Sequence, residues 1–270
     1  MPAAEAARSA VIRDVWFVSP RARALVEKSD PVSGDCMNES LVFGSPIDGL
    51  LERLYAQSAA QDDTLAAYFT TRAAEGSLDW NQFDERTDEF LKDKLIALDR
   101  SKAEFCYHMC RALRARRVVE AGTSFGVSTL FLAAAVRDNL LGEVEGGGGL
   151  PTVIGTEHEP HKARMARGHF AEAGLSDLID LREGDLRDTL RDVRGPVDFM
   201  LIDIWTPMAR PALSLVAPHL REGAVVICDN TQRFRDAYRE YFEFVNDPRN
   251  GLRTMTLPFE GGLEFTVRDR

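Results

Sequence analysis

The alternation of short β-type runs with helix-length stretches after residue 116 constrains the fold of this chain more than any other feature. Runs rich in branched apolar residues predict strands at 117–121, 152–156, 178–182, 197–204 and 224–228. The stretches that follow them predict helices at 128–136, 160–173, 207–220 and 231–245. Such alternation is typical of a parallel sheet covered by helices on both faces. We therefore expect an α/β fold.

The two ends of the chain depart from this alternation. Apolar runs at 252–257 and 263–267 predict an antiparallel hairpin at the sheet edge. Before residue 117, the pattern predicts helices at 46–60, 62–74, 84–98 and 101–113. We expect a helical extension, or cap, at 1–98 that makes substrate and oligomer contacts, and an α/β domain at 99–270. The Gly-rich segment 145–149 follows a predicted helix and is expected to be a flexible connection.

Composition and charge exclude several classes of protein. The net charge of −10, from 33 basic and 43 acidic residues, argues against a nucleic-acid binder with a broad basic face. Most of this charge, −9, falls on residues 31–90. No apolar run approaches the ~20 residues of a membrane helix, and the first residues lack the apolar centre of a signal peptide. We therefore expect a cytoplasmic protein with no membrane partner.

The cysteines do not form a disulfide or metal-binding pattern. They lie at Cys36, Cys106, Cys110 and Cys228, which is too few for a disulfide scaffold. Cys106 and Cys110 are one helical turn apart, and we expect them to pack in the hydrophobic core.

A glycine-containing turn follows the first predicted strand. Gly122 allows a sharp turn and a close approach of ligand to backbone, and Gly126 allows close packing where the next helix begins. Ligands of such sheets bind just beyond the carboxyl ends of the strands. The spacing Gly-x-x-x-Gly alone also occurs in purely structural turns. Glu120, beside the turn, would repel a pyrophosphate but suit a cationic amino acid or a sulfonium.

The ends of the next two strands carry acidic residues that suit an adenosine-bearing ligand. Glu157 follows the second strand, where its carboxylate can accept hydrogen bonds from both ribose hydroxyls. Asp185, after Gly184 at the end of the third strand, can accept a hydrogen bond from the exocyclic amine of adenine. The tighter Gly-x-Gly-x-x-Gly of nicotinamide dinucleotide sites is absent.

The segment from Val119 to Gly126, together with Glu157, resembles the class I S-adenosylmethionine-dependent methyltransferases, and within them the catechol and caffeoyl-CoA O-methyltransferases. The resemblance covers about residues 97–270. It implies a Rossmann-like fold with a seven-stranded, mostly parallel sheet, an antiparallel C-terminal hairpin and an N-terminal helical cap. It also implies S-adenosylmethionine as the cofactor. The residues expected to bind it are Glu120, Gly122, Thr123, Ser124, Gly126, Ser128, Glu157, His158, Gly184, Asp185 and Asp203.

Oxygen-bearing side chains also follow the fourth and fifth predicted strands. Asp203 ends the fourth strand, and Asp229 and Asn230 end the fifth. Because the ends of adjacent parallel strands lie together, these three side chains can converge on one point and form a hard-oxygen site for Mg²⁺ or Ca²⁺. Each residue alone also fits an Asx turn or a polar strand end. The resembled family has the same Asp and Asp-Asn pattern, and its metal ion binds two vicinal acceptor oxygens.

The sequence departs from the resembled family at Thr206. That family has a lysine three residues after the first metal-binding aspartate, where it acts as general base on the acceptor hydroxyl. A threonine hydroxyl is not an ordinary base near neutral pH. Metal coordination could acidify the acceptor sufficiently, Asp203 or His158 could take the proton, or catalysis could be lost. Asp203 and Thr206 are the candidate catalytic residues.

The expected function is methyl transfer from S-adenosylmethionine to a hydroxyl of a small, aromatic or catechol-like acceptor, assisted by a divalent cation such as Mg²⁺, in a homodimer. A metal-independent methyltransferase and a catalytically impaired cofactor-binding protein remain open as alternatives. Aromatic residues of the N-terminal part are expected in the core, at an oligomer face or in the acceptor wall; they include Trp16, Phe17, Tyr55, Tyr68, Phe69, Trp80 and Phe83.

Overall fold

The computed structural model describes residues 43–82, 84–141 and 152–269. The predicted connection at 145–149 lies outside the described residues, as do Trp16, Phe17, Cys36 and Phe83. Among the helices of the described residues, none is long and apolar enough to cross a bilayer.

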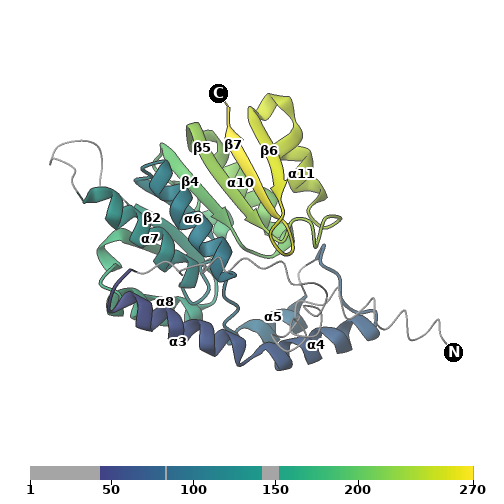
Figure 1. Cartoon of the computed structure of the whole chain (residues 1–270). Helices are drawn as coiled ribbons and strands as arrows, with labels where there is room; N and C mark the ends of the chain where they lie inside the picture. Colours follow the sequence, from purple (N-terminus) through teal and green to yellow (C-terminus); the bar gives the residue numbers. More distant parts are fainter. Residues whose placement is uncertain (1–42, 83, 142–151, 270) are drawn as a thin grey trace, which may run out of the picture.

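A seven-stranded mixed sheet forms the centre of the molecule (Figure 1). Its strands are β1 (Arg117–Ala121), β2 (Thr152–Glu157), β3 (Ile179–Glu183), β4 (Val197–Ile202), β5 (Leu220–Asp229), β6 (Leu252–Leu257) and β7 (Leu263–Arg268). Their order is β3-β2-β1-β4-β5-β7-β6, in which β1 to β5 are parallel and β7 is antiparallel to both β5 and β6. The predicted fold class, including the C-terminal hairpin, is confirmed.

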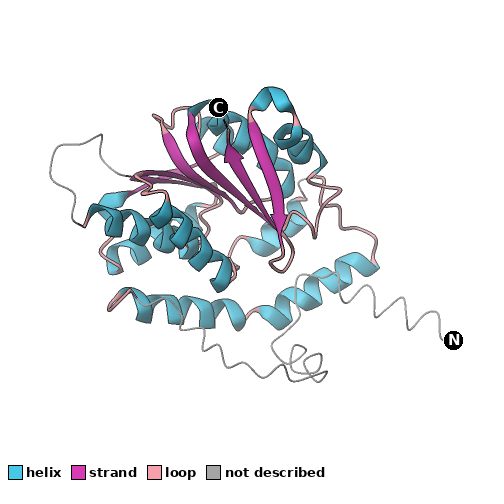
Figure 2. Cartoon of the chain, turned by 45° about the horizontal axis from the view of Figure 1, so that its top comes forward, coloured by secondary structure: helices cyan, strands magenta, loops and turns pink. Residues whose placement is uncertain are grey.

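Helices cover both faces of this sheet (Figure 2). They are α6 (Arg100–Ala112), α7 (Val127–Leu140), α8 (Pro160–Glu172), α9 (Leu186–Thr189), α10 (Thr206–Val216) and α11 (Arg239–Asn246). Successive strand residues point to opposite faces. Val118 and Leu201 pack with α6 and α7, whereas Val119 and Ile202 pack on the side of α9, α10 and α11. The two apolar layers explain why the strands read as continuous apolar runs.

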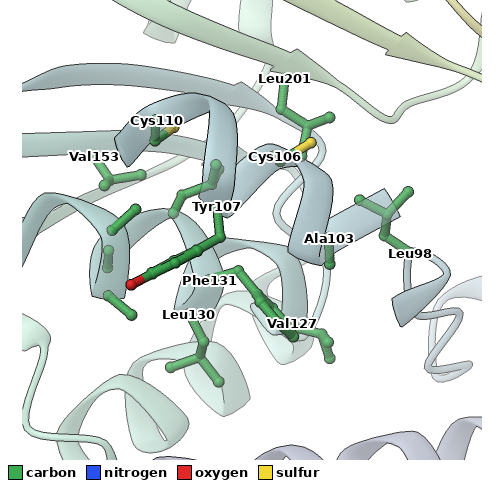
Figure 3. Packing of buried hydrophobic residues seen from close by; sticks show 14 of the residues in the cluster. Leu98, Ala103, Cys106, Tyr107, Cys110, Val127, Leu130, Phe131, Val153 and Leu201 are labelled. Atoms are coloured by element: carbon green, nitrogen blue, oxygen red, sulfur yellow. The ribbon is translucent and has the colours of Figure 1, made fainter. Parts of the chain in front are cut away.

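The two cysteines of α6 belong to the first of these layers. Cys106 and Cys110 are buried free thiols. Figure 3 shows them among Tyr107, Phe131 and Val153 in the packed core. The predicted packing role of this pair is confirmed.

Within the described residues, three helices precede α6 and lie along one side of the molecule (Figure 1): α3 (Ile47–Ala59), α4 (Asp62–Ala74) and α5 (Glu85–Leu91). The apolar face of α3 is buried, with Ile47, Leu50 and Leu54 in the same cluster as α7 and α8. In contrast, α4 and α5 enclose a small separate cluster around Leu65 and Phe69. The division at residue 98 thus runs through a shared core and does not separate two independent cores.

Residues 92–98 differ from the helix predicted over 84–98. The helix α5 ends at Leu91, and an extended segment follows it. The side chain of Gln61 satisfies the backbone N–H and C=O of Leu95, and the Ser58 hydroxyl accepts from the backbone N–H of Ala97. Because α3 and its end supply these partners, the segment needs no helical hydrogen bonds to bury Leu95 and Leu98.

The helix predicted over 231–245 is also shorter than expected, because α11 begins only at Arg239. Residues 231–238 form turns, and the backbone N–H groups of Gln232 and Arg233 both donate to the Gly261 carbonyl of the β6–β7 hairpin. These two bonds to the hairpin replace helical hydrogen bonds, and the helix begins later. A short helix that the sequence did not predict, α9, is capped by the Asp185 side chain, which accepts from the backbone N–H of Arg187.

The strand order places a crevice at the carboxyl ends of the parallel strands. β1 pairs with β2 on one side and with β4 on the other. The chain leaves β1 toward β2 and β3 and then returns to β4, so the connections after β1 and β4 run in opposite directions. Such a switch point is where open α/β sheets bind their ligands.

Candidate active site

A cavity of about 790 Å³ opens at the carboxyl ends of β1, β2, β4 and β5. The helix α5 and the extended segment 92–98 line its other side. Nine of the predicted cofactor-binding residues line the cavity: Gly122, Thr123, Ser124, Ser128, Glu157, His158, Gly184, Asp185 and Asp203. Its volume is within the ~300–1,000 Å³ typical of small-molecule sites.

The turn after β1 requires glycine at two positions for different reasons. Gly122 has φ of +101°, and a Cβ there would lie 2.0 Å from the backbone oxygen of Asp203. Gly126, at the start of α7, has φ of +87°, and its Cβ would lie 2.5 Å from the ring of Phe170 in α8. The first glycine lets the β1 and β4 ends approach each other, and the second lets α7 pack on α8. The close packing expected at Gly126 is found, but this residue does not line the cavity.

Glu120 differs from its predicted role as a cofactor ligand. Its side chain is fully buried and is not part of the cavity wall. Its carboxylate accepts hydrogen bonds from three hydroxyls, those of Thr123 at 2.9 Å, Ser128 at 2.6 Å and Thr129. Burial raises the pKa of Glu120, and these three donors oppose the shift. The predicted contact of Glu120 with the cofactor was therefore wrong. The carboxylate instead joins the turn after β1 to α7 inside the core, outside the cavity wall.

Glu157 connects the ends of β1 and β2. Its carboxylate accepts from the backbone N–H of Ser124 at 2.7 Å and from that of Glu159 at 2.8 Å. Ser124 is held in a left-handed conformation with φ of +51°. The side chain of Glu157 lines the cavity with 7% of its surface exposed, so the remaining lone pairs of its carboxylate are available to a hydrogen-bond donor in the cavity.

The other predicted cofactor-binding residues at the ends of β2 and β3 also line the cavity. The carboxylate of Asp185 caps α9 and pairs with Arg187, and these contacts lower the pKa of Asp185. His158 lies within 3.7 Å of three carboxylates, those of Asp88, Glu157 and Glu159. Gly184 donates its backbone N–H to the Glu157 carbonyl at 2.9 Å. These contacts fix the rim at the ends of β2 and β3.

The structure brings Asp203, Asp229 and Asn230 together on the cavity wall, as the strand ends predicted. It also adds a cation that sequence reasoning missed. Lys102 of α6 is 5% exposed, and its Nζ donates to Asp229 Oδ1 at 2.6 Å. The second oxygen of Asp229 accepts from Asn230 Nδ2 at 3.0 Å. Both carboxylate oxygens of Asp229 therefore have protein partners.

Burial affects the two carboxylates of this wall in the same direction. It raises the pKa of Asp203 to about 7, and the neighbouring charge of Asp229 adds to the shift. Burial also raises the pKa of Asp229, although its contact with Lys102 opposes that effect. Two acids at one strand edge with a single ammonium leave excess negative charge, which is an environment that attracts a further proton or cation.

Thr206 does not have the free hydroxyl that a catalytic role would need. It begins α10, is 7% exposed, and donates its Oγ1 hydrogen to the backbone carbonyl of Trp80. Its predicted place among the catalytic residues is therefore corrected: the hydroxyl is committed to holding the loop between α4 and α5. No local sequence motif marks the contacts of Trp80 and Lys102, because each is hydrogen-bonded to a residue more than 100 positions away.

Comparisons with known proteins agree with this geometry. Residues 119–231 match a family model described as "Methyltransferase domain". Over 139 residues the chain is 31% identical to the catechol O-methyltransferase of Mycobacterium tuberculosis, an alignment that covers 51% of this chain and 58% of that relative. The chain thus spans less than two thirds of the length of this relative.

Solved structures share the fold at low sequence identity. The S-adenosylhomocysteine-bound methyltransferase PaMTH1 of Podospora anserina superposes with a TM-score of 0.63 at 14% identity, over 95% of this chain and 98% of that one. The O-methyltransferase TomG of Streptomyces achromogenes, in complex with S-adenosylmethionine, gives 0.57 at 20% identity, over 70% and 92%. Together with the strand order, these matches agree with the resemblance found in the sequence: residues 119–231 are similar to methyltransferase domains, and the fold is that of the class I methyltransferases.

Proposed function

We propose that the protein transfers a methyl group from S-adenosylmethionine to a hydroxyl of a small aromatic, catechol-like acceptor. The single observation that supports this best is that one cavity contains both the turn at Gly122 to Ser128 with Glu157 and the acidic wall at Asp203. A cofactor held at the first would direct its reactive end toward an acceptor held at the second. A reaction of this kind depends mainly on alignment of the two reactants.

The residues present fit the cofactor. Glu157 would accept from the ribose hydroxyls, because two backbone N–H groups already orient its carboxylate toward the cavity. Gly122 lines the cavity, and its lack of a Cβ lets the turn lie directly against the backbone of Asp203, so the methionine part would bind beside that residue. When bound, S-adenosylmethionine supplies an electrophilic methyl group.

The first candidate for acceptor binding includes a divalent cation such as Mg²⁺. Asp203, Asp229 and Asn230 would hold it, and their oxygen atoms are the ligand type that this ion prefers. A bound ion would lower the pKa of the acceptor hydroxyl. In this candidate, Lys102 has to release Asp229 Oδ1, which it contacts at 2.6 Å.

The second candidate is methyl transfer without a metal, and the Lys102–Asp229 ion pair specifically favours it. The ammonium of Lys102 already neutralises one of the two acids of the wall. Asp203 would then take the proton of the acceptor hydroxyl on its carboxylate. Burial and the charge of Asp229 raise its pKa to about 7, close to the value that suits a general base at neutral pH.

The partners and assembly follow from the same proposal. We propose a small-molecule acceptor, with neither nucleic acid nor membrane as partner. Homodimer formation and a cytoplasmic location stay predictions from the sequence.

A methyl-transfer assay tests the function and separates the candidates. Labelled S-adenosylmethionine is incubated with a panel of catechols and phenols, with excess Mg²⁺ or with EDTA. Transfer lost in EDTA and in Asp229→Asn supports the metal candidate, whereas transfer that persists in EDTA supports the metal-free one. Asp192→Asn is the matched control, because that carboxylate is exposed and paired only with Arg194 in the described structure. Cofactor binding by calorimetry without turnover of any acceptor would contradict the proposal and leave a cofactor-binding protein.

A further inference from the structure

Three side chains that can bind a metal ion converge on the cavity wall, away from the Asp203 wall. Asp88 lies in the first turn of α5, whereas His158 and Glu159 lie between β2 and α8. All three line the cavity. One oxygen from each carboxylate and one ring nitrogen lie within 4.8 Å of one another. The N-terminal segment and the end of β2 therefore meet here through side chains of the metal-ligand type.

The spacing of these atoms is that of metal ligands. The Nε2 atom of His158 is 3.5 Å from Asp88 Oδ1 and 3.7 Å from Glu159 Oε1. Both distances exceed the ~2.7–3.2 Å of a hydrogen bond. Ligand atoms held about 2.0–2.1 Å from a zinc ion lie about 3.3 Å from one another in a tetrahedral arrangement. A small contraction of the three groups would therefore place one ion between them.

A buried carboxylate faces the other nitrogen of the same imidazole. Glu157 Oε1 is 3.5 Å from His158 Nδ1, and the side chain of Glu157 is 7% exposed. The backbone N–H groups of Ser124 and Glu159 hold this carboxylate in place. A histidine that binds a metal through one ring nitrogen usually directs the other at a carboxylate, which orients the ring and makes it a better ligand. This arrangement leaves Nε2 as the nitrogen that faces the ion.

The local charges also suit a cation. The carboxylate of Asp84 caps α5, and that of Glu159 makes no capping hydrogen bond at α8, so neither ligand acid is used as a helix cap. The balancing charge comes from Lys162 of α8. Burial lowers the pKa of Lys162, while the charges of Glu157, Glu159 and Asp88 oppose that shift. Three carboxylates around one ammonium leave negative charge that a divalent cation can balance.

We propose that Asp88, His158 and Glu159 form a zinc-type site that joins α5 to the end of β2. One imidazole and two carboxylates suit Zn²⁺ or Co²⁺, whereas Mg²⁺ prefers oxygen atoms alone. A water molecule would complete the coordination, since 47% of the His158 side chain is exposed. The site shares no ligand with the wall at Asp203, and it goes beyond the proposed methyl transfer. A bound ion would fix the N-terminal segment to the sheet.

Metal titrations test this site on the full chain, purified without a histidine tag and freed of metal with EDTA before dialysis. Calorimetry measures Zn²⁺ binding, and visible absorption measures Co²⁺ binding, because tetrahedral Co²⁺ absorbs strongly. Excess Mg²⁺ is present throughout to fill any oxygen-only site. The variants are Asp88→Asn and His158→Gln, on the two elements, and their combination. His161→Gln is the matched control, because this neighbouring imidazole contacts Arg164.

We expect the original protein and His161→Gln to bind one Zn²⁺ ion and to give the tetrahedral Co²⁺ spectrum. Each ligand variant should bind Zn²⁺ at least about tenfold more weakly and lose that spectrum. The double variant should lose less than the product of the two single losses, because both residues serve one site. Bound Zn²⁺ should raise the thermal unfolding midpoint of the original protein but not that of the ligand variants.

Two outcomes would overturn the inference: equal Zn²⁺ affinity in the original protein and Asp88→Asn, or no saturable Zn²⁺ binding to the original protein. Urea unfolding without metal shows whether each variant folds. Because these readouts use neither S-adenosylmethionine nor an acceptor, absence of methyl transfer would count against the proposed function and not against the zinc-type site.

Discussion

The cofactor side and the acceptor side of the cavity are built from contacts of very different range. On the cofactor side, Glu120 binds hydroxyls that lie 3, 8 and 9 residues further along the chain. On the acceptor side, Lys102 reaches Asp229 over 127 residues and Thr206 reaches Trp80 over 126. The contacts of Glu120 are complete once β1 and α7 have formed, whereas the acceptor side also requires the N-terminal helices to dock.

This difference separates two kinds of stabilisation. Short-range hydrogen bonds order little additional chain, so the cofactor turn is expected to be as stable as the sheet that carries it. The acceptor side depends on a few links between distant segments, of which the Lys102–Asp229 pair is buried, with 6% of each side chain exposed. Substitutions on the two sides should therefore differ in what they destabilise.

The largest effect is expected from Lys102→Met. It leaves the Asp229 carboxylate buried without its ammonium partner, which we expect to lower the free energy of unfolding by about 3–5 kcal/mol. Urea denaturation measures this. The exposed pair Arg53–Glu172, at a similar distance of 2.6 Å, provides the matched control: Arg53→Met should cost at most about 1 kcal/mol. An equal loss of unfolding free energy in the two variants would show that the buried Lys102–Asp229 pair stabilises the fold no more than an exposed pair does.

The next effect concerns the cofactor side. Gly126→Ala places a Cβ 2.5 Å from the Phe170 ring at a φ of +87°, so both a clash and backbone strain oppose it. We expect a loss of about 2–4 kcal/mol in the free energy of unfolding. Gly184→Ala is the control, because its φ is +123° but its Cβ would meet nothing closer than 3.7 Å. If thermal and urea unfolding show the two variants to be alike, packing of α7 on α8 is not what the second glycine provides.

The same contrast explains what could be predicted from the sequence. The strands and the glycine turn could be predicted because the β periodicity and the spacing of Gly122 and Gly126 are local features of the sequence. The wall of Asp203 and Asp229 followed from the rule that adjacent parallel strands end at the same edge of the sheet. The role of Lys102 was not predicted, and that of Trp80 stayed open between core, oligomer face and acceptor wall, because nothing near either residue in the sequence specifies a partner more than 100 residues away. Glu120 was placed in the right segment but on the wrong side of it, since the face of a strand end depends on the register of its neighbours.

The helical errors have the same origin. Residues 92–98 have a composition that suits a helix, yet the side chains of Ser58 and Gln61 satisfy the extended backbone. The turns over 231–238 are held by the Gly261 carbonyl of the hairpin. In both cases tertiary hydrogen bonds override local propensity.

A smaller effect, on binding, is expected from Glu157→Gln. The amide keeps the shape of the side chain but loses the charge that strengthens its hydrogen bonds, so the affinity for S-adenosylmethionine should fall about tenfold while the protein stays folded. Calorimetry measures the affinity. The carboxylate of Glu159, two residues away, makes no capping hydrogen bond at the start of α8 and lies 3.7 Å from His158. Glu159→Gln should therefore bind the cofactor almost as the original protein does. Equal affinities in both variants would contradict the assignment of Glu157 to the ribose.

The last effect is a pH dependence that belongs to the acceptor side. Because burial and the charge of Asp229 raise the pKa of Asp203 from 3.8 to about 7, the folded state favours the protonated carboxyl. The stability that this group contributes is fully present below pH 3.8 and is lost as the pH rises through 7. Asp203→Asn cannot titrate, so its stability relative to the original protein should increase across that interval. Urea denaturation at intervals of pH between 4 and 8 measures the difference, and a difference independent of pH would contradict the shift. Repeating the series with excess Mg²⁺ sharpens the comparison, because an ion held by Asp203 and Asp229 would favour the ionised carboxyl and flatten the dependence, whereas a wall already neutralised by Lys102 would leave it unchanged.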